Sequence, residues 1–331
     1  MLLRGEDISI GVTVFRRLDY LEQALESAVN QTIPVKVCLY DDGCEDHDGL
    51  KRILDRFSGR VMYSRNPENL GLFQNMNQCI WKSPTPWVSV LHDDDALAKD
   101  FVERILAVAP KVDQCSLFVG GTTYINFTNH PFYIKNEHPE IEWRHVPVEE
   151  LAVKNPCSFP GQLMLAATAI KLGGFPEKSL YTGDWELWFK LTQAGGTVQL
   201  GANLSYYRSH LDTNRGTTVA NRSGRKFACC AAQVKRNLAR LRAGGHEPRF
   251  DRTQWLHDQS PLYRDLLVYS WTMPGWLLRY NRQLLLLTKR TTYASRALNL
   301  VSKIFGNPGL RLAGLARLLG ERLGLKMPQT F

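Results

Sequence analysis

Apolar runs and amphipathic segments alternate along the first part of the chain. Runs rich in β-branched or apolar residues occur at residues 8–14, 35–40 and 87–91, and each is typical of a buried strand. Between the first two runs, the apolar residues of 19–29 recur on one helical face, with Asp19 as the expected N-cap. Strands alternating with helices favour parallel pairing, so the pattern predicts an α/β fold with a doubly wound, mainly parallel sheet.

Further elements continue this alternation. Strands are expected at residues 61–63 and 116–121, and helices at 50–57, through Met76 and Ile80, and at 184–191. Residues 126–156 are polar and contain several prolines and histidines, so they are expected to be loops around a site.

Two predicted strands run directly into acidic residues. Asp41 and Asp42 follow one run, and Asp93, Asp94 and Asp95 follow another. Consecutive carboxylates repel one another, which a fold tolerates when a bound cation neutralises them. Open α/β sheets bind ligands beyond the carboxyl ends of their strands, so one site is predicted there. The alternative for each cluster alone is a solvated acidic turn.

Composition narrows the class of protein. The chain has 331 residues, of which 44% are hydrophobic and 22% charged, as in globular proteins. Its seven cysteines form no CxxC pair and are expected to be reduced thiols of a cytoplasmic protein. Neither a secretory signal nor a membrane-spanning run is apparent in the sequence.

The positive charge is concentrated at the end of the chain. Residues 262–331 contain 11 basic and 2 acidic residues, which account for the whole net charge of +9. This distribution argues against a nucleic-acid-binding protein. Leucines of 310–326 share one helical face with arginines off it, so an anionic membrane surface on the inner face of the cell membrane is an expected partner. The alternative is a helical appendage packed on protein.

A set of motifs in order resembles the inverting family-2 glycosyltransferases of GT-A fold, over roughly residues 6–212. The motifs are Ile10-Gly11-Val12-Thr13-Val14, Ser27 to Gln31 with Thr32, Asp41-Asp42-Gly43, Asn69-Leu70-Gly71, His92-Asp93-Asp94-Asp95 and Gly183-Asp184-Trp185-Glu186-Leu187-Trp188. The chain departs from the family at His92, where the Asp-any-Asp-Asp metal motif has its first acid.

The resemblance implies a role for each matching residue. Asp184 corresponds to the catalytic base, with its alternative as a plain helix N-cap. Asp94 corresponds to the ligand of a divalent metal, manganese or magnesium. The remaining implied residues are Thr13, Phe15, Asp42, Asp93, Asp95 and Arg208 around the donor nucleotide and sugar, and His210 at the metal or diphosphate. Trp185 and Glu186 are either an acceptor-side wall or core.

The implied function is sugar transfer. We expect a GT-A catalytic domain over residues 1–215 and a basic, mostly helical region over 216–331 that docks on a membrane or a partner. The donor would be a nucleotide-diphosphate sugar and the acceptor a glycan or lipid-linked glycan of cell-surface polysaccharide. The alternatives are a sugar-nucleotide nucleotidyltransferase, disfavoured because no phosphate-binding glycine loop follows a strand, and a catalytically dead glycan- or membrane-binding protein.

Overall fold

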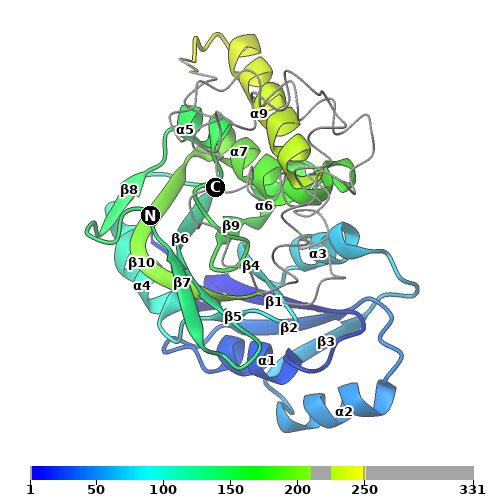
Figure 1. The fold of residues 1–331 in the computed structure, drawn as a ribbon. Helices are drawn as coiled ribbons and strands as arrows, with labels where there is room; N and C mark the ends of the chain where they lie inside the picture. The colour runs from blue at the N-terminus through cyan, green and yellow to red at the C-terminus, as the bar shows by residue number, and fades with distance from the viewer. Residues whose placement is uncertain (1, 210–224, 249, 251–331) are drawn as a thin grey trace, which may run out of the picture. The chain divides into compact units, whose positions relative to one another are not determined.

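A computed structural model describes residues 2–209, 225–248 and 250 (Figure 1). The chain divides into two units, Met1–His210 and Leu211–Phe331, and each is described by itself. The division expected after residue 215 falls outside the described residues, and the role expected for residues 216–331 stays a prediction.

Four parallel strands form the first half of the sheet. They are β1 (Ile8–Val14), β2 (Lys36–Asp41), β3 (Val61–Arg65) and β4 (Trp87–His92). Their order is β3-β2-β1-β4, so the chain moves outward from β1 to one side and then returns to its other side. In open α/β sheets, such a reversal marks the ligand-binding crevice, which here corresponds to the carboxyl ends of β1, β2 and β4.

Helices connect these strands. They are α1 (Leu21–Val29), α2 (His47–Arg56) and α3 (Leu72–Trp81). Figure 1 shows α3 above strands β1 to β3 and α1 below them. α3 approaches β1 closely at Gly11, where an added Cβ would lie 2.7 Å from Cys79 Cβ. Glycine at this position therefore allows the helix to pack on the sheet.

The second half of the unit extends the same sheet with strands of both directions. They are β5 (Ala96–Leu97), β6 (Leu117–Ile125), β7 (Pro131–Lys135), β8 (Trp143–His145), β9 (Leu163–Leu165) and β10 (Thr197–Arg208). The order continues β4-β9-β6-β10-β5, with β7 on β6 and β8 on β10. β10 is parallel to β6, whereas β9 runs antiparallel to both β4 and β6.

Four helices accompany these strands. They are α4 (Phe101–Val108), α5 (Val148–Val153), α6 (Ala166–Lys171) and α7 (Gly183–Gly195). Short 3-10 helices span Gly5–Asp7, Ala109–Lys111 and Glu177–Thr182. The core contains every residue of β1, the inner face of α1 and the aromatic side chains of α7. The α/β class predicted from the alternating pattern is confirmed.

Two local expectations were wrong. Residues 126–156 contain β7, β8 and α5 instead of loops alone. β7 lies at the edge of the sheet with Phe132, Tyr133 and Ile134 all exposed, so it lacks the one-sided burial that makes a strand visible in sequence. The N-cap of α1 is Tyr20 rather than Asp19, and no side chain caps it.

The second unit is represented by α9 (Arg225–Ala243). Val234, Leu238 and Leu241 are buried and recur at helical spacing, while Arg240 and Arg242 occupy the last turn. Of the described helices, none is long and apolar enough to cross a bilayer.

Candidate active site

The acidic strand ends predicted from the sequence meet at one edge of the sheet. Strand pairing places Thr13 of β1 between Tyr40 of β2 and His92 of β4, and Val14 beside Asp41. Because the three strands are parallel neighbours, the residues that follow them share the same crevice.

The turn after β4 presents two carboxylates to one guanidinium. Arg17 Nη2 lies 2.7 Å from Asp93 Oδ1, and Arg17 Nη1 lies 2.5 Å from Asp94 Oδ2. The carboxylate side chains are 9% and 13% exposed, while the Arg17 side chain is 33% exposed. Burial alone would lower the pKa of Arg17, but the charges of Asp93 and Asp94 outweigh it and raise that pKa. A partly exposed cation therefore offsets part of the negative charge of the acidic turn.

Asp95, the third acid of the turn, is held differently. It is buried, and its Oδ1 accepts a hydrogen bond of 2.9 Å from the Arg208 backbone N–H. Its Oδ2 has no hydrogen-bond partner among the described residues. Burial and the negative charge of Asp94 raise the pKa of Asp95 well above its usual range. Asp95 thus ties the turn to β10.

The guanidinium of Arg208 connects the turn to two other segments. Its Nε donates to Asp94 O at 2.9 Å, its Nη1 to Asn129 Oδ1 at 2.6 Å, and its Nη2 to Gln23 Oε1 at 2.7 Å. The cation also lies 4.0 Å from the centre of the Tyr20 ring. With its donors engaged in this way, Arg208 has the contacts of a residue that braces the acidic turn.

His92 replaces an acid with a half-buried aromatic ring. It stacks on Phe159, with ring centroids 4.3 Å apart and an interplanar angle of 18°. Its Nδ1 lies 3.3 Å from Thr13 Oγ1, and burial lowers its pKa. The neutral ring packs between β1 and the segment before β9. Placing a charged carboxylate there would cost more free energy of desolvation.

The acids at the end of β2 are surrounded by donors of their own chain. Asp41 Oδ1 accepts from the backbone N–H groups of Gly43 and Cys44, and its Oδ2 accepts from Tyr63 and Arg65. Both oxygens are therefore used to build the turn after β2.

Asp42 binds the loop before α3. Its Oδ1 accepts from Asn66 Nδ2 at 2.9 Å and from the Leu70 N–H at 2.8 Å, and its Oδ2 accepts from the Gly71 N–H at 2.9 Å. Gly71 has φ +83°, a conformation that favours glycine. Asp42 thus fixes the Asn69-Leu70-Gly71 motif beside the crevice.

Asp184 lies in the first turn of α7, where the helix dipole favours a carboxylate. The N-cap is Thr182, so Asp184 is not the plain N-cap that was its structural alternative. It is half-buried, and its Oδ2 accepts from Asn155 Nδ2 at 3.3 Å. The next residues face inward: Trp185 donates to Leu151 O, and Glu186 bonds to Ser179. Trp185 and Glu186 therefore belong to the core.

The sequence of this crevice also matches a known family. Residues 9–161, which contain both acidic strand ends, match the model of glycosyl transferase family 2. They belong to that family.

Two relatives illustrate how far the likeness extends. A Rickettsia typhi protein named as an uncharacterized glycosyltransferase is 23% identical over 186 residues, covering 55% of this chain and 58% of the relative. Abequosyltransferase RfbV of Salmonella typhimurium is 29% identical over 100 residues, covering 28% of this chain and 29% of the relative. The chain thus spans less than two thirds of the length of either curated relative.

Solved structures of family-2-like fold superpose over most of the chain. S. aureus TarS 1-349 in complex with UDP-GlcNAc has a TM-score of 0.57 at 13% identity, covering 96% of this chain and 92% of TarS. Mannosyltransferase PcManGT from Pyrobaculum calidifontis, in complex with GDP-Man and Mn2+, has a TM-score of 0.51 at 12% identity, covering 97% and 88%. These likenesses confirm the GT-A fold.

The structure brings most of the expected family-2 residues to this edge. The crevice and its support contain Thr13, Asp42, Asp93, Asp94, Asp95 and Arg208. Phe15 follows β1, half-buried, with Arg16 4.7 Å above its ring. His210 lies outside the described residues.

Arg17 is the residue that sequence reasoning missed. It lies in a short polar segment between β1 and α1, and no pattern of spacing links it to the acidic turn 76 and 77 residues later. The paired Arg16-Arg17 directly after a strand that borders an acidic site was the available signal.

The acidic turn fits a hard divalent metal through its donor chemistry. Asp94 Oδ2 and Asp93 Oδ1 are carboxylate oxygens, which suit magnesium or manganese, and both already hold a cation. Across residues 2–209, 225–248 and 250, no three His, Cys, Asp or Glu side chains are grouped as a complete metal site. Oxygens from a bound donor would therefore have to complete the coordination.

Proposed function

We propose that this chain is an inverting, metal-dependent glycosyltransferase. It would move a sugar from a nucleotide-diphosphate donor to a hydroxyl of a glycan or lipid-linked glycan in cell-surface polysaccharide synthesis. The observation that carries the proposal is the pair Asp93 and Asp94, held at the sheet crevice by the partly exposed Arg17. The relatives and structural neighbours described above support it, since they include an abequosyltransferase and proteins bound to UDP-GlcNAc and GDP-Man.

The acidic turn would serve the leaving group. A divalent metal at Asp94, when bound, supplies positive charge to the diphosphate as the glycosidic bond breaks. Arg17 can exchange the carboxylates for phosphate oxygens, because guanidinium binds both in the same bidentate geometry. Asp93 is then left to contact the donor ribose or sugar.

The nucleoside would lie along the ends of β1 and β2. Thr13 and Phe15 border this part of the crevice, and Asp42 orients the loop at Gly71. In this arrangement Asp42 supports the nucleotide through the backbone of that loop. The backbone N–H of Arg208 donates a hydrogen bond to Asp95 Oδ1 and so holds the turn against β10.

Asp184 would act as the base. The acceptor oxygen attacks the anomeric carbon in line and forms the new bond. The bond from that carbon to the diphosphate oxygen breaks, and the nucleoside diphosphate leaves with the electron pair. The proton of the acceptor hydroxyl passes to Asp184, and the configuration at the carbon is inverted.

A thermal-shift panel tests the donor class. Nucleoside diphosphates are added with and without manganese, and one of them should raise the unfolding temperature only when the metal is present. The corresponding sugar nucleotide should then lose its sugar slowly to water without acceptor. If no nucleoside diphosphate stabilises the protein in either condition, the proposal is wrong. Stabilisation without any turnover of the donor would indicate the catalytically dead alternative.

The basic residues of 262–331, which lie outside the described part, are proposed to dock on an anionic membrane surface. This would place the enzyme at the inner face of the membrane, beside a lipid-linked acceptor. Sedimentation with vesicles of phosphatidylcholine alone and with added phosphatidylglycerol tests it. Equal binding to both vesicles would contradict the proposal.

A further inference from the structure

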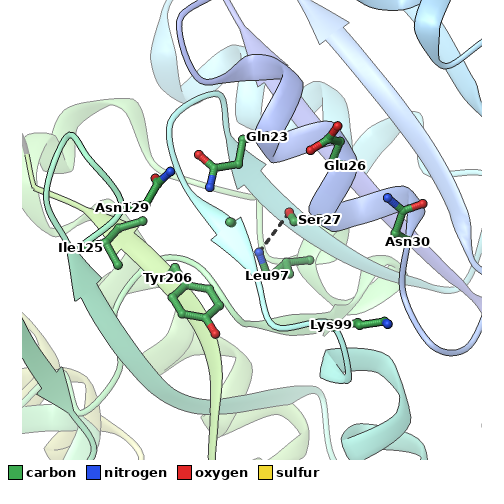
Figure 2. Close-up of a pocket in the computed structure, with 10 residues that line it drawn as sticks. Gln23, Glu26, Ser27, Asn30, Leu97, Lys99, Ile125, Asn129 and Tyr206 are labelled. Atoms are coloured by element: carbon green, nitrogen blue, oxygen red, sulfur yellow. Dashed lines mark hydrogen bonds between the residues drawn. The ribbon is translucent and has the colours of Figure 1, made fainter. Parts of the chain in front are cut away.

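A pocket lies beside the acidic turn, next to the residues that Arg208 contacts on α1 and on the turn after β6. It has a volume of about 530 Å³, within the range of small-molecule sites. α1 forms one wall, and β5, the β6–β7 turn and β10 form the others (Figure 2). Of the described residues assigned above to the donor or to catalysis, none lines it.

The α1 wall is rigid and polar. Gln23, Glu26, Ser27 and Asn30 occupy one stripe of the helix, at the spacing that places side chains on a common face. Ser27 Oγ accepts from the Leu97 N–H at 3.1 Å and donates to Ala24 O at 2.7 Å, so the helix is fastened to β5. The wall is therefore formed before any ligand arrives.

Three amides of the pocket are oriented by arginines. Arg208 donates to Gln23 Oε1 and to Asn129 Oδ1, and Arg60 donates to Asn30 Oδ1 at 3.1 Å. A guanidinium has donors only, so each amide turns its oxygen toward the arginine. The three NH₂ groups then remain as donors on the pocket side, as their positions around the opening in Figure 2 illustrate.

Among the described residues that line the pocket, the charges balance. Glu26 supplies a carboxylate that accepts hydrogen bonds, and Lys99 supplies an ammonium on the same rim. Arg208 adds no anion-binding capacity, because its nitrogens already donate within the chain. A phosphate or another strong anion therefore finds no excess positive charge, and a neutral ligand rich in hydroxyl groups fits the donors and acceptors together.

Tyr206 adds an aromatic surface. It lines the pocket from β10 and is 40% exposed. Aromatic faces pack on the C–H groups of sugar rings, and amides and carboxylates bind the ring hydroxyls. We propose that this pocket binds a saccharide, as a subsite separate from the donor crevice.

The proposal goes beyond the proposed transfer reaction and does not depend on it. Arg208 contacts Asp94 O on one side and two pocket amides on the other, so the pocket is adjacent to the crevice without sharing its carboxylates. A glycan held here would be kept at a high local concentration beside that crevice.

The test is binding of the full-length protein to a printed array of defined oligosaccharides, without nucleotide and without metal. Saccharides that bind are then titrated by calorimetry. We expect Tyr206→Ala and Glu26→Gln each to weaken binding at least tenfold. Tyr206→Phe, which keeps the ring, should change it less than threefold. The matched controls are Tyr133→Ala and Glu103→Gln, exposed residues of the same unit outside the pocket, and they should leave binding unchanged.

Two results would overturn the proposal. One is that no saccharide on the array binds. The other is that the pocket variants and their controls bind equally. Because Tyr206→Ala removes a side chain from a strand, thermal unfolding is measured for each variant. If Tyr206→Ala proves unstable, the binding measured for Glu26→Gln, on the surface of α1, decides the test. If a separate assay detected no sugar transfer by the protein, the proposed function would be refuted. The proposal of saccharide binding in this pocket would still stand.

Discussion

The carboxylates at the end of β2 accept hydrogen bonds from the segments that follow them in the chain, whereas those at the end of β4 depend on arginines from distant segments. Asp41 and Asp42 accept hydrogen bonds from backbone N–H groups and side chains. These donors lie in the turn after β2, on β3 and in the loop before α3. Asp93 and Asp94 instead face Arg17, which is partly exposed. The first pair has the contacts of a structural brace, and the second has those of a site whose cation can be exchanged.

This difference shows that acidic strand ends are not equivalent even when they share a crevice. A carboxylate with both oxygens satisfied by several backbone and side-chain donors gains little from a ligand and loses much if it moves. A carboxylate paired with a partly exposed side chain can change partners at smaller cost. The predictions below test this contrast, beginning with the largest expected effect.

Asp184 is the acid for which we expect the largest loss of activity. Asp184→Asn removes the group that accepts the acceptor proton, so the rate of sugar transfer should fall roughly a thousandfold. The dissociation constant of the donor, measured by calorimetry, should change less than twofold. Asp55→Asn, at an exposed residue of α2, is the control and should retain full activity. Transfer within tenfold of normal in Asp184→Asn would remove Asp184 from the mechanism.

Asp41 should matter for folding rather than for binding. Asp41→Asn places an NH₂ group among donors that are buried or partly buried, so the free energy of unfolding should fall by about 3 kcal/mol. Urea unfolding followed by circular dichroism measures it. Asp94→Asn should cost less than about 1 kcal/mol, because Asp93 still holds Arg17. If both variants lose equal stability, the contrast between the two strand ends is lost.

Asp42 sharpens the comparison, because family resemblance assigns it to the nucleotide while its contacts are with the loop. Asp42→Asn should lose the acceptor for the Gly71 N–H and lower the unfolding free energy by about 1–2 kcal/mol. Any change in donor affinity should then result from the altered position of the Gly71 loop. A variant that unfolds normally but binds donor ten times more weakly would show that Asp42 contacts the nucleotide directly.

Arg17 should give the smallest effect, and its sign is informative. Arg17→Gln removes the cation that competes for Asp94, so manganese alone should bind about tenfold more tightly, equivalent to ~1.4 kcal/mol. The nucleoside diphosphate with manganese should bind more weakly, because a phosphate partner is lost. Calorimetry measures both constants. Arg16→Gln, whose side chain lies over Phe15, is the matched control. Unchanged metal affinity in Arg17→Gln would contradict the exchange of cations.

Much of the fold followed from short-range patterns. Buried strands such as residues 8–14 and the apolar face of 19–29 are set by side-chain periodicity, which the chain carries locally. Strand β7 was not predicted, because its exposed Phe132, Tyr133 and Ile134 show no alternation and its pairing with β6 decides its conformation. Asp19 failed as an N-cap because the helix begins one residue later than its pattern implied.

The sequence by itself determined the α/β class, the acidic strand ends and the motif order that marks family 2, because each depends on residues close together in the chain. Only the tertiary structure decided which acids face a cation. Arg17 reaches Asp94 across 77 positions, and Arg208 reaches Gln23 across 185. Such partners are chosen by strand order and by the crossing of segments, which no local spacing encodes. The polar pocket of α1 and β10 exists for the same reason.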